Sequence, residues 1–377
     1  MIERTQKERE LIADAERIFP TSTRCLTFQE DLNFCVSKAK GSHIWDVSGN
    51  EYIDYLLGSG PHVLGHAHPA VLEALRTIPE NGTSFLIINE NAVALGKKII
   101  EHVPCADMVS LHSSGSEATF FALRLARVYR KRDKILKFEG AYHGMHDYAM
   151  MSNQWTMGSP PLPQAVPNTH GIPRVLNDEV LIAPFNDLER TVEIISKHQD
   201  ELAGVIIEPV QRTFEPKPGF LQGVREVTAK LDIPLIFDEV VTGFRLGLGG
   251  AQELYGVTPD LCALGKAISG GLPLGCRTRC RPGPSRRIPF ARVWRAQSSP
   301  NSRNLASTSA WKRSERGSAR AFATRLPMRE SKHVSPACQA CSKSGSPRKS
   351  LSIIRRRKHP TSTRTSDSRT FFCSKAY

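Results

Sequence analysis

The chain has 377 residues, of which 40% are hydrophobic and 23% are charged, so it is long enough for two domains or one large α/β domain. Its net charge of +14 arises in one region, because residues 276–377 contain 25 Lys and Arg against only 3 Asp and Glu. Residues 1–275 are mildly acidic, which excludes a basic nucleic-acid surface spread over the whole chain.

The predicted elements alternate between strands and helices along the first 275 residues. An amphipathic helix is expected over residues 2–18, and two strands over 43–47 and 52–56 flank a Ser-Gly-Asn turn. Further strands are predicted at 107–111, 134–138, 203–207, 233–237 and 261–264, with helices at 116–131, 187–200 and 220–231. This alternation is typical of crossover units on a mainly parallel sheet, which is an α/β fold.

The alternation stops after Gly275. Residues 276–377 contain 19 serines, many arginines and little apolar periodicity, and such a chain buries too little surface to offset its ordering entropy. We therefore expect three parts: an N-terminal segment 1–50, a large α/β domain 51–275, and a disordered basic tail 276–377.

The change at residue 275 is too abrupt for an ordinary domain boundary, because no linker separates the two compositions. We hypothesise a shift of reading frame near codon 275. Sequencing the gene and translating the other frames downstream tests this hypothesis, which fails if no frame yields alternating strand and helix patterns.

Polar or small residues follow five of the predicted strands at the point where each strand ends. These segments are 112–115 (HSSG), 139–140 (EG), 208–209 (EP), 238–239 (DE) and 265–266 (GK). Ligands of parallel sheets bind at the carboxyl ends of the strands, so these segments are expected to surround one site.

Lys266 is the most informative residue of this set. Glycines and other small residues surround it, and partial burial there favours the neutral amine that forms a Schiff base with an aldehyde. Asp238 follows an apolar strand and offers a carboxylate that can keep the ring nitrogen of pyridoxal phosphate protonated. Taken singly, the two residues are also explained as a solvated lysine in a turn and a helix-capping acid.

Three further segments each have a functional and a structural interpretation. Residues 113–118 (SSGSEA) can bind a phosphate at a helix N-terminus, or form a capping box of Ser114 with Glu117. Tyr142 can stack on a planar ring, or fill the core as a loop aromatic. Residues 338–341 (CQAC) have the spacing of half a zinc site, but no second pair completes it, so no metal site is predicted.

Taken together, the motifs resemble those of a known family. They are 46–54 (DVSGNEYID), 64–69 (LGHAHP), 114–118 (SGSEA), 142–144 (YHG), 208–210 (EPV), 238–245 (DEVVTGFR) and 265–266 (GK). In this order they resemble the class III pyridoxal-phosphate-dependent aminotransferases, and within that family the glutamate-1-semialdehyde 2,1-aminomutases. The resemblance covers residues 20 to 275.

The resemblance implies fold type I of the pyridoxal-phosphate-dependent transferases, with a mostly parallel sheet, helices on both of its faces, and homodimers. Family members continue past the lysine with an antiparallel strand and later a small carboxy-terminal domain. Residues 272–274 (LPL) begin this strand, but we expect that 276–279 (CRTR) cannot continue it as a buried strand. The implied fold is therefore truncated before the small domain.

The resemblance also implies a role for each matching position. Lys266 would bind the cofactor, pyridoxal 5'-phosphate, and move a proton between substrate and cofactor, while Asp238 would pair with the ring nitrogen. The other implied cofactor-binding residues are Ser114, Gly115, Ser116, Tyr142, His143, Gln211 and Val240. Arg24 and Glu208 would contact the substrate, although Arg24 is equally well explained as a surface arginine.

Arg212 departs from the family pattern. Aminomutases usually place small residues after the 208–210 motif, whereas this chain has Gln211 and Arg212. The departure bears on the identity of the substrate more than on the cofactor.

Three hypotheses for function follow. The first is an enzyme that moves an amino group on a small amino acid or amino aldehyde, including the rearrangement of glutamate 1-semialdehyde to 5-aminolevulinate. The second is an inactive, frameshifted remnant of such an enzyme. The third is a fusion whose basic tail binds nucleic acid or an anionic membrane; residues 355–358 (RRRK) support it, although the tail lacks an aromatic platform.

The compartment is predicted from what the sequence lacks and from its cysteines. We find no signal peptide and no apolar run long enough to span a membrane. The four cysteines before residue 276 are scattered among apolar or small residues, as in a reducing compartment. The sequence therefore predicts a cytoplasmic protein with no membrane partner.

Overall fold

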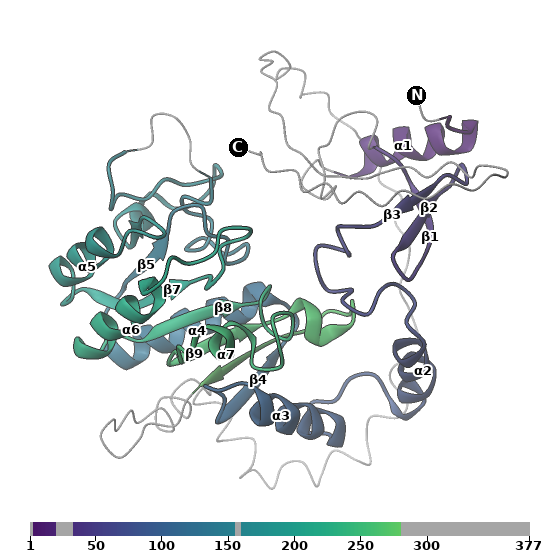
Figure 1. Ribbon diagram of the computed structural model, residues 1–377. Coiled ribbons are helices and arrows are strands. Elements are labelled where there is room, and N and C mark those ends of the chain that lie inside the picture. Colours follow the sequence, from purple (N-terminus) through teal and green to yellow (C-terminus); the bar gives the residue numbers. More distant parts are fainter. Residues whose placement is uncertain (1–2, 20–32, 155–159, 280–377) are drawn as a thin grey trace, which may run out of the picture. The chain divides into compact units, whose positions relative to one another are not determined.

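The computed structural model describes residues 3–19, 33–154 and 160–279, and all of them belong to one compact unit. They contain a three-stranded antiparallel sheet and a seven-stranded mixed sheet with its helices (Figure 1). Every strand and helix predicted between residues 107 and 264 is confirmed, with ends that shift by at most three residues.

The elements are named in chain order. They are α1 (Gln6–Ile18), β1 (Val36–Lys40), β2 (His43–Asp46), β3 (Glu51–Ile53), α2 (Pro69–Thr77), η2 (Ile78–Asn81), α3 (Glu90–His102), β4 (Met108–His112), α4 (Gly115–Arg130), β5 (Lys134–Phe138), η3 (Arg174–Asn177), β6 (Val180–Ala183), α5 (Leu188–Lys197), β7 (Leu202–Ile207), α6 (Phe220–Lys230), β8 (Leu235–Glu239), α7 (Gly250–Tyr255), β9 (Leu261–Leu264), η4 (Lys266–Ser269) and β10 (Gly275–Arg279).

The predicted N-terminal helix and the two strands after it are present as α1, β2 and β3. Thr5 caps α1, since its side-chain oxygen accepts the N–H of Glu8 at 3.3 Å. The buried carboxylate of Glu8 in turn accepts the N–H of Cys35 at 2.9 Å and the hydroxyl of Ser48. These bonds fasten α1 to the small sheet, in which β2 pairs antiparallel with both β1 and β3.

The large sheet has the strand order β4-β10-β9-β8-β7-β5-β6. The neighbours from β9 to β6 pair in parallel, whereas β10 pairs antiparallel with both β4 and β9. Because β4 and the five parallel strands run in the same direction, their carboxyl ends meet at one edge of the sheet.

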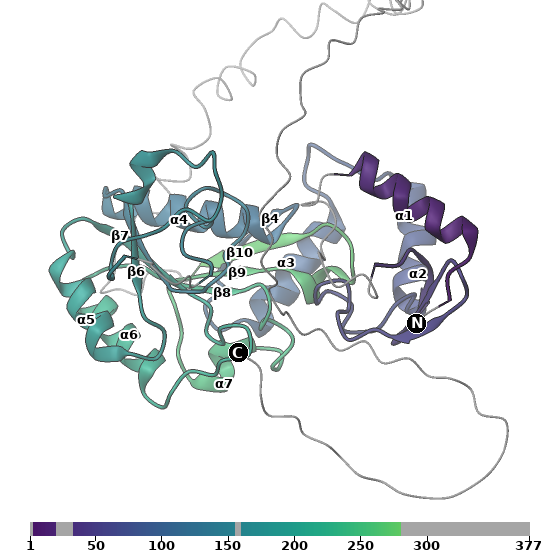
Figure 2. The ribbon, with the colours of Figure 1, turned by 90° about the horizontal axis from the view of Figure 1, so that it is seen from above.

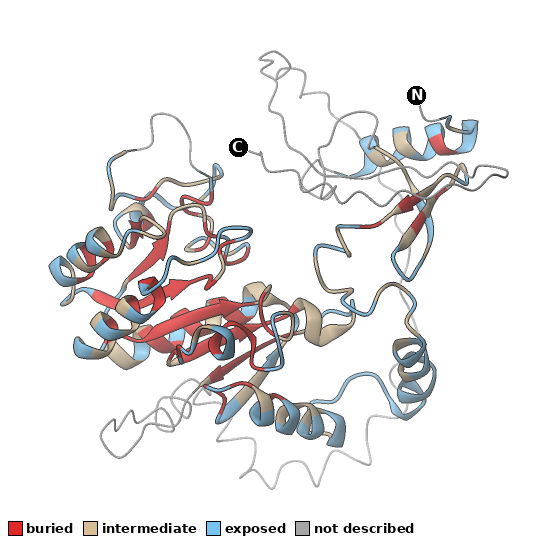
Figure 3. Ribbon diagram, viewed as in Figure 1, coloured by how far each residue is buried: buried red, intermediate tan, exposed pale blue. Residues whose placement is uncertain are grey.

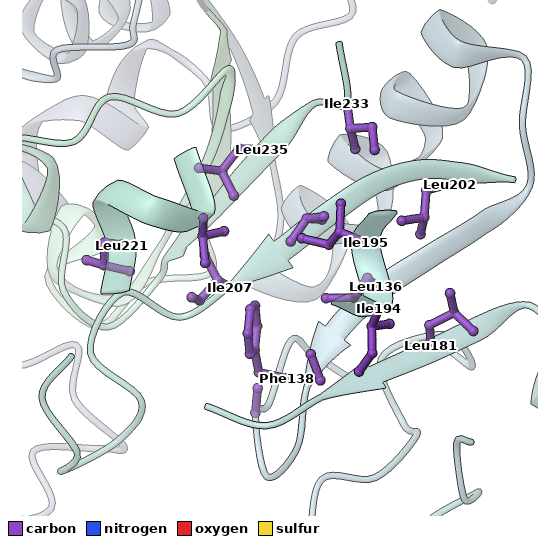
Figure 4. Close-up of a cluster of buried hydrophobic side chains, with 14 of the residues drawn as sticks. Leu136, Phe138, Leu181, Ile194, Ile195, Leu202, Ile207, Leu221, Ile233 and Leu235 are labelled. Carbon is purple, nitrogen blue, oxygen red and sulfur yellow. The ribbon is translucent and has the colours of Figure 1, made fainter. Parts of the chain in front are cut away.

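Helices cover both faces of the large sheet, as predicted. Leu136, Ile207 and Leu235 pack into one apolar cluster with residues of α5 and α6 (Figure 4), and Val205 belongs to the same cluster. The neighbouring residue Gly204 faces α4 instead, because a Cβ there would lie 3.0 Å from the Cβ of Ala126. Figures 1 and 2 show α4 on one face and α5 and α6 on the other. Burial on both faces explains the nearly continuous apolar runs of these strands, which are buried along their length (Figure 3).

The prediction that residues 276–279 cannot form a buried strand is wrong. β10 lies inside the sheet, where Arg277 is only 4% exposed and Cys276 and Thr278 are at most 1% exposed. The strand pairs with β4 over its whole length and with β9 from Cys276 onward, and this backbone ladder forms with any side chain except proline. The sheet therefore continues to Arg279, while the tail after it, including residues 338–341, lies outside the described residues.

The described residues contain neither a membrane-spanning helix nor a metal-binding cluster. No helix among them has the length and apolar character needed to cross a membrane. No group of His, Cys, Asp and Glu side chains in residues 3–19, 33–154 and 160–279 is arranged to hold a metal ion. The cysteines in these ranges, Cys35, Cys105, Cys262 and Cys276, are free thiols.

Candidate active site

The carboxyl ends of β5, β7, β8 and β9 and the N-terminus of α4 surround a cavity of about 440 Å³. It is lined by Gly115, Ser116, Thr119, Tyr142, His143, Gly144, Glu208, Arg212, Asp238, Val240, Val241 and Lys266. Eight of these twelve are predicted site residues, so the structure brings most of the predicted set together. Ser114 and Gln211 adjoin lining residues without lining the cavity themselves, and Arg24 lies outside the described residues.

Asp238 is the buried acid of this cavity, and only 4% of it is exposed. One carboxylate oxygen lies 2.7 Å from Nδ1 of His143, and the other accepts the N–H of Val240 at 3.1 Å. Burial raises the pKa of Asp238 to about 7 and lowers the pKa of His143 to about 3. The imidazole is therefore neutral at pH 7 and donates its Nδ1–H to Asp238, which leaves Nε2 buried without a partner among the described residues.

Asp238→Asn is expected to gain stability over the unmodified, cofactor-free chain as the pH rises toward 7. The folded pKa of Asp238, about 7, lies above its usual 3.8, so between these values the folded state binds more protons than the unfolded state. The unmodified chain therefore loses stability as the pH rises, by at most ~1.4 kcal/mol per pH unit, and asparagine removes this loss. Urea unfolding of both proteins at about pH 5 and about pH 7 measures the difference, and an equal difference at both would contradict the raised pKa.

Lys266 follows β9 through Gly265 and begins η4. Its φ of 44° lies in the left-handed region, a strain of order 1–3 kcal/mol that is typical of functional sites. The side chain is half-buried, and burial lowers the pKa of its amine, while the charges of Asp238 and Glu208 act in the opposite direction. Lys266 therefore lines the cavity together with two acids, Asp238 and Glu208. The alternative interpretation of Lys266 as a solvated lysine in a turn does not describe this position.

Ser114 and Glu117 cap the N-terminus of α4 as the sequence predicts, although Glu117 binds the N–H of Ser113 and not that of Ser114. The Oγ of Ser114 accepts the N–H of Glu117 at 3.2 Å, and the Glu117 carboxylate accepts the N–H of Ser113 at 2.7 Å. The capping residues Ser114 and Glu117 do not line the cavity. Gly115 and Ser116 line it, so the positive end of the helix dipole is at the cavity. The structural and the functional interpretation are therefore compatible.

Two glycines let other segments approach this helix end closely. A Cβ on Gly275, at the start of β10, would lie 2.2 Å from the carbonyl oxygen of Ser114. Gly144 has a φ of 109°, and a Cβ there would lie within 2.8 Å of Ser116. Glycine at both positions keeps the backbone of the cavity wall tightly packed.

Tyr142 is 41% exposed at the cavity, so the alternative that it fills the core is wrong. Its N–H donates to a carboxylate oxygen of Glu208 at 3.1 Å, and burial raises the pKa of Glu208. Gln211 is buried and its Nε2 donates to the carbonyl oxygen of Glu139 at 2.7 Å, while its Oε1 has no partner among the described residues. Glu208 and Gln211 thus hold the loop after β5 against the end of β7.

Lys137 supports the same loop and is not among the predicted site residues. Its side chain is fully buried in β5, and its ammonium, which has three N–H groups, lies within hydrogen-bond distance of four oxygens: Ala141 O at 2.9 Å, Ala149 O at 3.0 Å, Asn153 Oδ1 at 2.5 Å and Met151 O. Burial lowers the pKa of Lys137 to about 7. Lys137 lies between two apolar residues, Leu136 and Phe138, and this position was the available sequence signal. Thr119, Gly144, Arg212 and Val241 are the other unpredicted residues at the cavity.

Comparison with known proteins gives consistent results. Residues 27–282 match the family described as Aminotransferase class-III. A glutamate-1-semialdehyde 2,1-aminomutase of Methanococcus maripaludis is 46% identical over 248 residues, which are 65% of this chain and 57% of the relative. The crystal structure of an omega-transaminase from Sphaerobacter thermophilus has a TM-score of 0.70 and 37% identity, covering 74% of this chain and 64% of its own. A transaminase with PLP bound has a TM-score of 0.69 and 32% identity, covering 77% and 69%.

These matches cover only part of this chain and part of each relative. The chain spans 57% of the length of the Methanococcus maripaludis relative. The family match extends past Gly275, in agreement with the buried strand β10. Because this match covers more than half of the sequence and includes every described residue of the cavity, the chain belongs to the class III aminotransferase family.

Proposed function

We propose that this chain binds pyridoxal 5'-phosphate in the cavity and catalyses amino-group transfer, as an aminotransferase or an aminomutase. The observation that carries the proposal is that Lys266 and Asp238 line one cavity together with the N-terminus of α4. An amine, a buried carboxylate and a helix N-terminus match the aldehyde, the ring nitrogen and the phosphate of this cofactor. The cavity therefore offers one partner for each of these three groups of the cofactor.

Asp238 would hold the ring nitrogen. Its two oxygens are already oriented by His143 and by the N–H of Val240, so the carboxylate is fixed before the cofactor arrives. His143 is therefore a positioning residue in this proposal.

The remaining contacts follow from the lining of the cavity. Tyr142 and Val240 would contact the two faces of the ring, and Gln211 would reach its phenolic oxygen. The phosphate would lie at the first turn of α4, which consists of Ser114, Gly115 and Ser116.

When bound, pyridoxal phosphate supplies an aldehyde that reacts with amines and a ring that withdraws electrons. Burial of Lys266 increases the fraction of its amine that is neutral, and only the neutral amine can attack an aldehyde carbon or accept a proton. From the cavity wall, Lys266 would take a proton from the substrate carbon that bears the amino group and return it to the product.

The substrate would be a small amino acid or amino aldehyde. The 46% identity to a glutamate-1-semialdehyde 2,1-aminomutase supports glutamate 1-semialdehyde, rearranged to 5-aminolevulinate, as one substrate to test. Glu208 lines the cavity and would face the substrate. Arg24, the other substrate residue implied by the resemblance, lies outside the described residues.

We further propose that the chain forms a homodimer. Leu86, Ile87 and Ile88 are each at least 79% exposed, and monomeric proteins rarely expose three consecutive large apolar side chains. An apolar cavity of about 500 Å³ is lined by α2, by the turn after Lys266, and by Gly82 and Thr83, which precede this segment in the chain. A second copy would cover this surface next to the active site, and sedimentation of a single monomeric species would contradict the dimer.

The free thiols of the described cysteines support the cytoplasm as the compartment.

An inactive remnant is the second candidate. It is favoured by one observation, namely that the family match ends at residue 282 although the chain continues to residue 377. Nucleic-acid binding by the basic tail stays a prediction, because the tail lies outside the described residues.

Uptake of the cofactor distinguishes these candidates. Purified chain mixed with pyridoxal phosphate should acquire a visible absorption band, and reduction with borohydride should leave a stable adduct on the peptide that contains Lys266. Mass spectrometry identifies the modified lysine. A colourless chain without an adduct would support the remnant, and an adduct confined to other lysines would refute the proposed site.

A further inference from the structure

Arg212 extends the cavity wall beyond the groups assigned above. It follows the end of β7 and lies in a tight turn, in which Gln211 and Phe214 exchange two backbone hydrogen bonds of 2.9 Å each. The residue is exposed to solvent and at the same time lines the cavity. Its guanidinium is therefore at the border between the active site and water.

The backbone of Arg212 is strained. Its φ of 59° lies in the left-handed region, which costs an L-residue with a side chain roughly 1–2 kcal/mol and costs glycine almost nothing. Glycine at this position would avoid the cost. The long charged side chain of Arg212 is thus present where the turn itself favours glycine.

The guanidinium of Arg212 is also poorly satisfied within the described residues. Its one hydrogen bond there runs from Nη2 to the carbonyl oxygen of Asn153 at 3.4 Å, near the limit for such a bond. Arg225 on α6, by comparison, pairs with Asp260 at 2.7 Å. Most of the five N–H donors of Arg212 remain available to a ligand.

The charges around the cavity favour an anion beside Arg212. Both oxygens of Asp238 accept hydrogen bonds, from His143 and Val240, and one oxygen of Glu208 accepts from Tyr142. The positive charge of Arg212 acts on Glu208 and on Lys266, which places the guanidinium within electrostatic range of both. A planar guanidinium binds a carboxylate through two parallel hydrogen bonds.

We propose that Arg212 binds a carboxylate of the substrate and thereby restricts the site to amino compounds that carry one. This inference rests on the proposed function and specifies its substrate class. Arg212 is a specificity-determining residue in this proposal and takes no part in proton transfer.

The test compares two probes that differ in charge and hardly in shape, butyrate and its neutral amide, butyramide. Neither probe has an amine, so neither reacts with pyridoxal phosphate. Dissociation constants are measured by ligand-observed NMR on the chain loaded with the cofactor. We expect the unmodified chain to prefer butyrate, because only the carboxylate can form charge-assisted bonds with the guanidinium.

The variant is Arg212→Gly, because glycine accepts the left-handed backbone and should preserve folding. It is expected to weaken butyrate binding by about 10-fold or more, the loss of one charge-assisted contact, and to leave butyramide unchanged. Arg212→Lys, which keeps the charge but not the planar fork, should fall in between. Arg190→Gln removes an equal charge from α5, away from the cavity, and should change neither constant.

The outcomes distinguish a failure of the proposed function from a failure of the role assigned to Arg212. If the unmodified chain takes up no pyridoxal phosphate, the proposed function fails, and this inference fails with it. If the chain takes up the cofactor and Arg212→Gly binds butyrate as tightly as before, only the role of Arg212 is refuted. Equal losses for butyrate and butyramide would show that Arg212 shapes the cavity without recognising charge, and would also overturn the inference.

Discussion

Replacing Lys266 by alanine is expected to abolish covalent attachment of pyridoxal phosphate, so that the absorption band of the lysine-attached form and the reduced adduct both disappear. Lys137 cannot take its place, because it is fully buried and its amine is surrounded by four oxygens. The cofactor should still bind without a covalent bond, since Asp238 and the N-terminus of α4 are unchanged. Any amino-group transfer by the unmodified chain should fall by roughly 100- to 10,000-fold, which is typical of a lost acid–base group.

The matched control for this variant is Lys98→Ala on α3. The Lys98 side chain is 69% exposed and pairs only with Glu101, so its loss should leave the band, the adduct and turnover unchanged. Absorption spectra and mass spectra of the two variants are recorded at the same cofactor concentrations. A visible band that survives in Lys266→Ala and is lost in another lysine variant would move the reactive amine elsewhere.

Much of the large sheet could be predicted because its strands are buried on both faces. Residues 134–138 and 261–264 match β5 and β9 without any shift, since a parallel strand between two helical layers is an almost unbroken apolar run. β6, with only four residues, follows a long segment without periodicity and was not predicted. Residues 276–279 (CRTR) were not expected to form a buried strand, whereas the backbone ladder with two neighbours determines the position of β10.

The candidate site was predictable to the extent that it depends on strand ends. Asp238 and Lys266 each follow an apolar strand, and the topology places such residues at one edge. Arg212 and Gly144 line the cavity through turns whose paths no local pattern specifies. The interaction of His143 with Asp238 joins residues 95 positions apart and is visible only in the folded chain.

The buried position of Lys137 could not be predicted from the sequence for a different reason. A lysine in a strand ordinarily indicates a solvent-facing position, and nothing in residues 134–138 shows that the following loop folds back over the amine. The loop oxygens that bind Lys137 come from positions 4 to 16 residues further along the chain. Their arrangement depends on the whole segment and on its packing against the sheet.

Lys137→Met is therefore expected to destabilise the fold strongly. Methionine has a similar length but no donor, so the oxygens of Ala141, Ala149, Met151 and Asn153 would lose a shared partner in a buried site. Below pH 7, where Lys137 carries its charge, removing one partner of a buried charged network typically costs about 3–5 kcal/mol. That is a large part of a total stability of roughly 5–15 kcal/mol, so the variant should unfold at a clearly lower urea concentration than the unmodified chain.

The effect should also reach the active site. Lys137 binds the loop on both sides of Tyr142 and His143, at Ala141 and at Ala149, and His143 in turn orients Asp238. Loosening this loop is expected to weaken uptake of pyridoxal phosphate even in the fraction of Lys137→Met that remains folded. Urea unfolding followed by circular dichroism measures the stability, and absorbance titration measures the uptake.

Lys134→Met is the control that isolates burial. It makes the same substitution on the same strand, but Lys134 pairs at the surface with Glu201 at 3.0 Å, and such pairs contribute about 1 kcal/mol or less. If Lys137→Met loses no more stability than Lys134→Met, the hydrogen bonds of the ammonium contribute little. The loop would then be held by its other contacts, such as the 2.8 Å backbone bond between Gly140 and Ser152. A loss several times larger at Lys137 would show that the cavity wall depends on a buried charge outside the cavity itself.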